Sequence, residues 1–191
     1  MTRLGRIAGA FLLALAAIVS PSWADEGATR VARFYPMFET GQLVGCQIGF
    51  SVDRIDDEYA GGTPSMVNGL LVIRFDWRSG SPMPFMFVRL AVTYGGDFFA
   101  PERAYLRSGF RTNVSEARTS FPSEAGTMFV FDFGEQTVEA FTQGMISGRF
   151  RLAYGMPDTQ VDAMLAVDLS DHPHVLQDFR DCFDALLETA A

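Results

Sequence analysis

The sequence contains no lysine, and arginine accounts for all 15 residues of its Lys and Arg total. The absence of lysine excludes Schiff-base chemistry, Ser-Lys catalytic dyads and the P-loop lysine of nucleotide-binding proteins. Histidine is also scarce, so a serine triad or a histidine general base would have to use His172 or His174. No Gly-x-Ser-x-Gly, His-Glu-x-x-His, Gly-x-Gly-x-x-Gly or Walker motif occurs in the chain. We therefore expect a protein that is not an enzyme and that binds no cofactor.

The apolar run at residues 7–19 is short, with 13 residues against the roughly 20 that a transmembrane helix needs. Two arginines precede this run, and it is followed by Ser22 and Ala24, small residues at the positions that a signal peptidase recognises. This pattern predicts a cleavable signal peptide at residues 1–24. The expected product is an exported, periplasmic protein with no transmembrane segment after cleavage.

Acidic residues outnumber basic ones, and cleavage after Ala24 would leave 13 arginines against 23 aspartates and glutamates, a net charge of −10. Such a surface repels DNA, RNA and anionic lipid headgroups at long range, so we expect no nucleic-acid partner. Residues 25–191 comprise 167 residues, and a chain of that length buries about 70% of its unfolded surface. They are expected to form a single β-rich domain.

Alternating apolar residues predict a mainly β protein. The clearest strand covers residues 43–52, where every second residue is apolar. The acidic residues 53–64 are expected to form a loop. Further strands are expected at residues 71–77, 85–94, 104–112, 128–133, 149–154 and 161–169. The strand at residues 85–94 has two apolar faces through Val88, which indicates a central strand, and the last two strands form a hairpin. We predict an antiparallel β-sandwich or flattened barrel of about eight strands.

Two helices are expected in the C-terminal third. A short helix at residues 135–143 places Val138 and Phe141 three residues apart and ends at Gly144. A second, amphipathic helix follows Asp171, which we interpret as its N-cap. Its apolar stripe consists of Val175, Leu176, Phe179, Cys182, Phe183, Leu186 and Leu187. We expect this stripe to pack on a sheet.

The two cysteines, Cys46 and Cys182, both occupy apolar faces, one on the first clear strand and the other on the last helix. In an exported protein two cysteines leave one possible pairing. A disulfide would close a loop of about 137 residues and contribute at most about 5 kcal/mol in the chain-entropy model. The alternative, a thiol redox site, is disfavoured because no Cys-x-x-Cys spacing occurs.

Two clusters could hold a metal ion. His172, His174 and the adjacent Asp171 could bind Zn²⁺ or Cu²⁺, although Pro173 restricts how the two imidazoles converge, and solvated residues at a helix entrance are the simpler interpretation. The second cluster could bind Ca²⁺, but its spacing does not fit the EF-hand loop and favours a solvated loop. Its members are Asp53, Asp56, Asp57 and Glu58.

Arginines share strand faces at two places. Arg107 and Arg111 lie on one face of their strand, and Arg149 and Arg151 on one face of another, with Arg103 nearby. Guanidinium groups bind carboxylate and phosphate in bidentate fashion, so these arginines are candidates for an anion-binding stripe. The alternative is ordinary pairing with acidic neighbours on a solvated sheet face.

Phenylalanine is common, with 18 residues, and two groups could line apolar ligand grooves. One group is Phe85, Phe87, Phe98 and Phe99, and the other is Phe129, Phe131 and Phe133. Aromatic residues at alternating strand positions are more often part of the core, which is the simpler interpretation here.

The C-terminal third resembles the invasion-associated locus B family of exported bacterial proteins. The resemblance covers a short helix at residues 137–144, a strand at residues 149–154, a strand that ends in Val167-Asp168-Leu169-Ser170, and the amphipathic helix. It implies a periplasmic β-sandwich with a packed terminal helix, and it carries no catalytic residues.

The favoured interpretation is a periplasmic, non-enzymatic binding or protein-interaction module whose partner is an envelope protein or a small ligand. Two alternatives stay open. One is a metal-binding protein that uses the His-x-His sequence. The other is a carboxylate-based hydrolase, which needs two acidic side chains facing each other at roughly 5 to 10 Å.

Overall fold

A computed structural model describes residues 27–56, 63–76, 83–108, 113–157, 159–160 and 162–190. The predicted signal peptide, Asp57, Glu58 and Arg111 lie outside the described residues. Within the described ranges the chain forms eleven strands and two helices, which confirms a mainly β protein but exceeds the eight strands expected.

A large antiparallel sheet forms one layer of the molecule. Its strands lie in the order β1 (Ala28–Glu39), β2 (Gln42–Asp56), β3 (Thr63–Asp76), β4 (Met83–Tyr94), β9 (Gly126–Asp132) and β8 (Thr119–Ser123), and β5 (Asp97–Phe99) pairs with β4. The predicted central position of residues 85–94 is confirmed, because β4 pairs with β3 on one side and β9 on the other. Residues 53–56, expected in a loop, instead extend β2.

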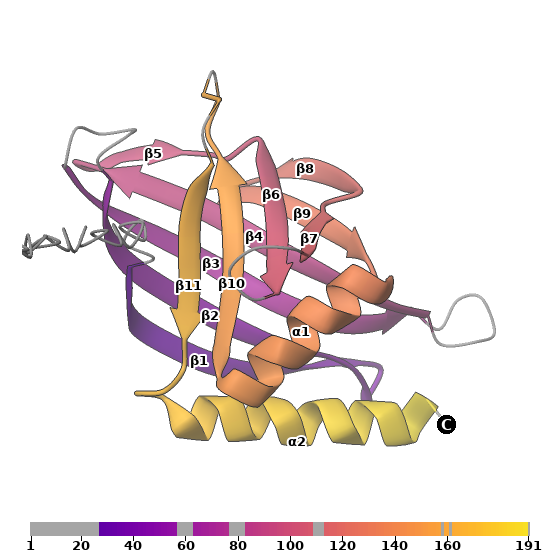
Figure 1. Ribbon diagram of the computed structural model, residues 1–191. Helices are drawn as coiled ribbons and strands as arrows, with labels where there is room; N and C mark the ends of the chain where they lie inside the picture. The colour runs from indigo at the N-terminus through magenta and orange to yellow at the C-terminus, as the bar shows by residue number, and fades with distance from the viewer. Residues whose placement is uncertain are drawn as a thin grey trace, which may run out of the picture.

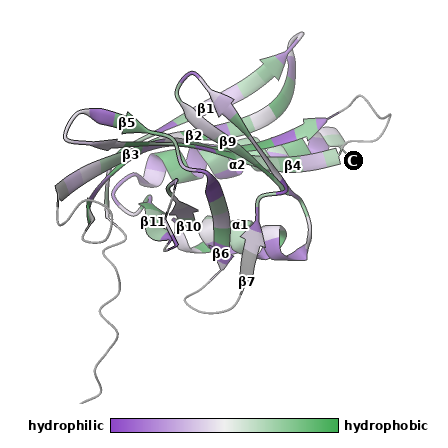
Figure 2. Ribbon diagram, turned by 90° about the horizontal axis from the view of Figure 1, so that it is seen from above, coloured by the Kyte–Doolittle hydropathy of each residue, from purple (hydrophilic) through white to green (hydrophobic). Residues whose placement is uncertain are grey.

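A smaller antiparallel sheet forms the second layer, in the order β11 (Ala163–Asp168), β10 (Arg149–Gly155), β6 (Arg103–Ser108) and β7 (Asn113–Glu116). The predicted hairpin of β10 and β11 is confirmed. The small sheet and both helices lie on the same side of the large sheet (Figures 1 and 2). The two sheets are separate in the described part of the chain, so the fold is an antiparallel sandwich.

The core lies between the two sheets. The alternation predicted for residues 43–52 is confirmed, because Val44, Cys46, Ile48 and Phe50 are buried. Across the sandwich, every second residue of β10 and β11 closes the core from the small sheet. These residues include Phe150, Leu152, Tyr154, Leu165 and Val167.

The first helix, α1 (Glu135–Ser147), is longer than predicted. It continues through Gly144 and ends at Gly148, whose φ of 71° lies in the left-handed region that glycine adopts without strain. Gly144 instead lies where a Cβ atom would overlap the ring of Phe150, so it permits close packing of α1 on β10. The expected pairing of Val138 with Phe141 is wrong in part, because Val138 is exposed.

The second helix, α2 (Pro173–Ala190), packs along β1 and β2, as the apolar stripe predicted (Figure 1). The prediction of Asp171 as the N-cap is wrong by one residue. The helix starts at Pro173, and the carbonyl of His172 accepts the first helical hydrogen bond. Proline at the first helical position loses no hydrogen bond, because that amide has no helical acceptor.

The predicted disulfide is confirmed: Cys46 of β2 and Cys182 of α2 are bonded, with Cα atoms 6.1 Å apart and a sequence separation of 136. The ring of Phe141 on α1 packs against four other phenylalanines, which joins both helices to β10. The Nε atom of Arg180 on α2 donates to the carbonyl of Met145 near the end of α1, at 3.0 Å. Neither described helix combines the length and hydropathy needed to cross a membrane.

Candidate functional site

The predicted arginines meet on the outer face of the small sheet. In β6 the residues Ala104 and Leu106 point into the core, while Arg103 and Arg107 alternate with them and point outward. Arg149 and Arg151 do the same in β10. The structure therefore brings together four of the five arginines that the sequence singled out, and Arg111 is outside the described residues.

Within this group, Arg107 and Arg151 are direct cross-strand partners. Their remaining cross-strand neighbours are Val114 for Arg107 and Ala166 for Arg151, so neither arginine has an acidic residue directly opposite. Like charges directly opposite each other in an antiparallel pair are destabilising. The strand register thus brings two guanidinium groups together on this face, and we take the pair as the candidate binding site.

The side chain of Arg107 crosses the small sheet. Its Nη1 atom donates to the thioether Sδ of Met164 at 3.0 Å. Arg107 belongs to β6 and Met164 to β11, and these strands lie on opposite sides of β10, so the side chain spans the width of β10. A thioether is a weak acceptor, and an anionic oxygen is a much stronger one.

The other arginines contact carboxylates and carbonyls. Arg103 donates to the carboxylate of Asp162 at 2.7 Å and to the carbonyl of Thr159 at 2.8 Å, which anchors the connection between β10 and β11. Arg149 lies 3.7 Å from the carboxylate of Asp168, its cross-strand partner. A hydrolytic pair would need acids available for catalysis, and Asp162 and Asp168 both pair with arginine here.

The pKa of Asp168 is lowered first by hydrogen bonds from Ser170 and then by the nearby arginines. Burial by itself raises the pKa of Asp168, but hydrogen bonds from Ser170 and the charges of Arg149 and Arg151 outweigh burial and leave its pKa below the ordinary value. Asp168 therefore remains a carboxylate and cannot serve as a general acid near neutral pH.

A cavity of about 200 Å³ opens on the same face, beside the arginines. It is lined by Tyr105, Arg107, Ala153, Asp162 and Met164. Burial, followed by the negative charges of Asp162 and Glu116, raises the pKa of Tyr105 above its ordinary value, although the charge of Arg103 opposes this. The phenol therefore stays neutral and presents an aromatic wall.

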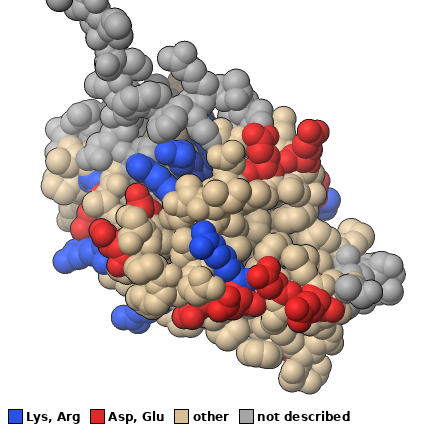
Figure 3. Space-filling model, turned by 60° about the horizontal axis from the view of Figure 1, so that its bottom comes forward, with Lys and Arg blue, Asp and Glu red and all other residues tan. Residues whose placement is uncertain are grey.

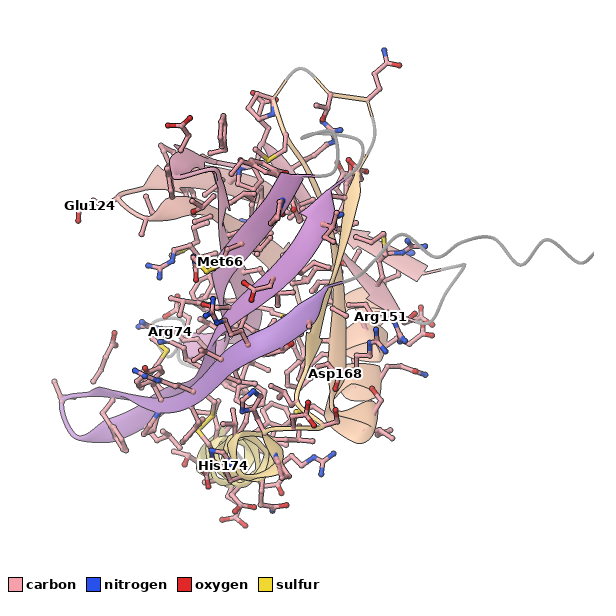
Figure 4. The ribbon with its side chains drawn as sticks, turned by 90° about the vertical axis from the view of Figure 1, so that its left-hand side faces the viewer. Met66, Arg74, Glu124, Arg151, Asp168 and His174 are labelled. Carbon is pink, nitrogen blue, oxygen red and sulfur yellow. A yellow bond between two sulfur atoms is a disulfide. The ribbon has the colours of Figure 1, made fainter. Side chains whose placement is uncertain are left out.

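The charge distribution is local rather than uniform. Figure 3 shows basic side chains in compact groups on the visible face, with acidic side chains beside them. Figure 4 places Arg151 near Asp168 on one side of the molecule, and Arg74 and Met66 on the opposite side, across the large sheet. A ligand attracted by the arginines of the small sheet would thus approach from one direction.

The structure does not bring the predicted metal-ligating side chains together in a metal site. His174 lies in the first turn of α2 and is exposed, as is Asp171, whereas His172 is half-buried (Figure 4). Among the described residues, no group of three or more His, Cys, Asp or Glu side chains is positioned to hold a metal ion. In the acidic segment, Asp53 lies 3.7 Å from Arg30, while Asp57 and Glu58 are outside the described ranges.

The predicted aromatic grooves are not formed as grouped: Phe85 and Phe87 line a cavity of about 260 Å³ with Arg74 and Asp76, but Phe98 and Phe99 do not contribute to its lining. Phe129 and Phe131 are 0% exposed and belong to the core, so their grouping as a groove is wrong. Phe98 pairs with Thr93 of β4. Thr93 lies six residues after Phe87, which corresponds to about 20 Å along the strand. The pairs Phe85–Phe87 and Phe98–Phe99 therefore lie toward opposite ends of the strand and cannot line one groove.

Sequence reasoning missed the outer face of the large sheet. We define an outer apolar patch there from three adjacent strands, consisting of Leu70, Phe85, Phe87, Met128 and Val130. Arg89 lies between Leu70 and Met128, and Val72, beside Phe87, is buried. The two apolar faces of residues 85–94 were the available signal, but they indicated burial on both sides. The described helices and the small sheet all lie on the other side of the large sheet, so none of them covers the patch (Figure 2).

The C-terminal third forms α1, β10, β11 and α2 in that order, which is the order of elements on which the family resemblance rests. A scan against protein-family models, a search of curated proteins and a search of solved structures found no match to this chain, so the resemblance to the invasion-associated locus B family stays a prediction.

Proposed function

We propose that this protein is a non-enzymatic binding module of the periplasm that holds an anionic ligand on the outer face of its small sheet. The observation that carries the proposal is the direct cross-strand pairing of Arg107 with Arg151. A carboxylate or phosphate bound between two guanidinium groups offsets their repulsion and accepts strong, charge-assisted hydrogen bonds. Arg149, on the same face of β10, lies 3.7 Å from the carboxylate of Asp168, which balances its charge, so the proposed ligand is held by Arg107 and Arg151.

Two features support a periplasmic location. Residues 1–24 have the pattern of a cleavable signal peptide. The bond between Cys46 and Cys182 is typical of proteins that fold in an oxidising compartment.

The proposal is tested by titrating inorganic phosphate and acetate into the purified, oxidised protein at constant ionic strength, with heat of binding as the readout. R107Q and R151Q should each weaken phosphate binding at least about 10-fold, since a hydrogen bond to a charged group contributes about 1.5 to 3 kcal/mol. R33Q is the matched control, because Arg33 is an exposed arginine on β1 in the large sheet. No phosphate or acetate binding by the unmodified protein, or an equal loss in R33Q and R107Q, would contradict the proposal.

A further inference from the structure

We infer that the anionic ligand also carries an aromatic ring, which occupies the cavity beside Arg107. This inference rests on the proposed anion-binding function and specifies the ligand class of the same site. The shared chemistry is a planar ring that bears a carboxylate or a phosphate monoester.

Strand register divides the outer face of the small sheet into rows that differ in chemistry. One row holds the charged pair Arg107 and Arg151. The next row along the strands holds Glu116, Tyr105, Ala153 and Met164, and Ala153 lies between Tyr105 and Met164. Cross-strand neighbours face the same side of a sheet, so Tyr105, Ala153 and Met164, which we call the apolar row, lie directly beside the charged pair.

The apolar row has the form of a slot. Ala153 forms its floor, and Tyr105 and Met164 rise on either side of it, from strands about 10 Å apart. An aromatic ring placed on Ala153 would contact the phenol ring of Tyr105 and the thioether of Met164. Aromatic pairs and sulfur–aromatic contacts are both favourable beyond the burial of apolar area.

The two ends of the slot differ in charge and so orient the ligand. At one end Arg107 reaches across β10 toward Met164. At the other end lies Asp162, held by Arg103 at 2.7 Å. The anionic group of the ligand therefore points toward Arg107 and Arg151. A second anionic group on the far side of the ring would meet the ion pair of Arg103 with Asp162, which offers no net positive charge.

Calorimetric titration of the oxidised protein with five anions tests this inference. Phenyl phosphate should bind at least about 10-fold more tightly than inorganic phosphate, and benzoate more tightly than acetate. Terephthalate, which has a second carboxylate opposite the first, should bind more weakly than benzoate. Equal affinity of phenyl phosphate and inorganic phosphate would overturn the ring assignment while leaving the anion site intact, and failure of all of these anions to bind would overturn both proposals.

Two variants locate the ring. A153L places a larger side chain on the floor of the slot, and M164A removes one of its walls. If A153L does not fold, M164A alone tests the position of the ring. Each variant should reduce the advantage of phenyl phosphate over inorganic phosphate, measured on the same variant, from about 10-fold to less than about 2-fold. An unchanged advantage in M164A would place the ring elsewhere and contradict the inference.

Discussion

Arg54 of β2 donates a hydrogen bond to the hydroxyl of Tyr154 of β10, at 3.0 Å, and thereby connects the large sheet to the small sheet inside the core. Arg54 is 6% exposed and Tyr154 is 0% exposed. The guanidinium also lies 5.8 Å from the centre of the tyrosine ring, in cation–π range. A buried arginine loses its hydration, so each hydrogen bond that it retains in the fold matters for stability.

We expect Y154F to lower the free energy of unfolding by about 1.5 to 3 kcal/mol, because it removes an acceptor from a buried charged group. Chemical denaturation monitored by circular dichroism measures the change. Y35F is the matched control, since Tyr35 is an exposed residue of β1 and should change stability by less than about 0.5 kcal/mol. Equal stability of Y154F and the unmodified protein would show that the bond between the sheets contributes nothing.

The disulfide should be a major source of stability. Replacing both Cys46 and Cys182 by alanine is expected to lower the free energy of unfolding by about 2 to 5 kcal/mol, because the bond closes a loop with a sequence separation of 136 residues. The same loss should follow reduction of the unmodified protein with dithiothreitol, which should have no effect on the double variant. A reduced protein that unfolds at the same denaturant concentration as the oxidised one would contradict this prediction.

Replacing Gly144 by alanine should destabilise the protein, although helix propensity alone favours alanine. In an exposed helix interior, Gly to Ala stabilises by about 1 kcal/mol. Here the new methyl group would overlap the ring of Phe150, so G144A should destabilise by about 1 to 3 kcal/mol. Thermal unfolding compares it with Q143A, a change at the neighbouring exposed position of α1. A gain in stability for G144A would show that α1 moves away from β10 without cost.

The carboxylate of Asp168 should contribute to stability near neutral pH, and this contribution should be lost at low pH. Its pKa in the folded protein lies below the ordinary value, so its carboxylate stabilises the fold above the unfolded-state pKa of about 4. That contribution is lost as the pH falls through the lowered pKa of the folded state. The difference in unfolding free energy between the unmodified protein and D168N should therefore be constant above about pH 5 and shrink below about pH 4.

Denaturation curves from pH 2 to pH 7 measure this difference. D178N is the control for loss of one negative charge, because Asp178 is exposed on α2. A difference between the unmodified protein and D168N that grows as the pH is lowered would contradict the electrostatic account of Asp168.

The sequence predicted those parts of the fold in which one face of an element is buried. Alternation in β2 and the apolar stripe of α2 indicated the two faces that carry Cys46 and Cys182, and hence their pairing. The strand β1 gave no such signal, because it is an edge strand in which Ala32 is the one buried residue. Edge position also explains why Pro36 is tolerated in it.

The candidate site was predictable only in part. Strand parity indicated that Arg149 and Arg151 share a face of one strand, and that Arg107 and Arg111 share a face of another. Register between strands is set by the core and the turns rather than by the charged residues themselves, so the pairing of Arg107 with Arg151 was not visible in the sequence. Met164 and Asp162 line the cavity because of the same strand register, so their part in the site was not visible in the sequence either.

The variant R107E tests the central claim most directly, because it places an acid opposite Arg151. Without ligand it should be more stable than the unmodified protein by about 0.5 to 1 kcal/mol, since an attractive pair replaces a repulsive one. Inorganic phosphate should raise the melting temperature of the unmodified protein and of R33E, which carries the same change in net charge, but not that of R107E. An R107E protein that is less stable than the unmodified one, or that phosphate still stabilises, would contradict an anion site built on Arg107 and Arg151.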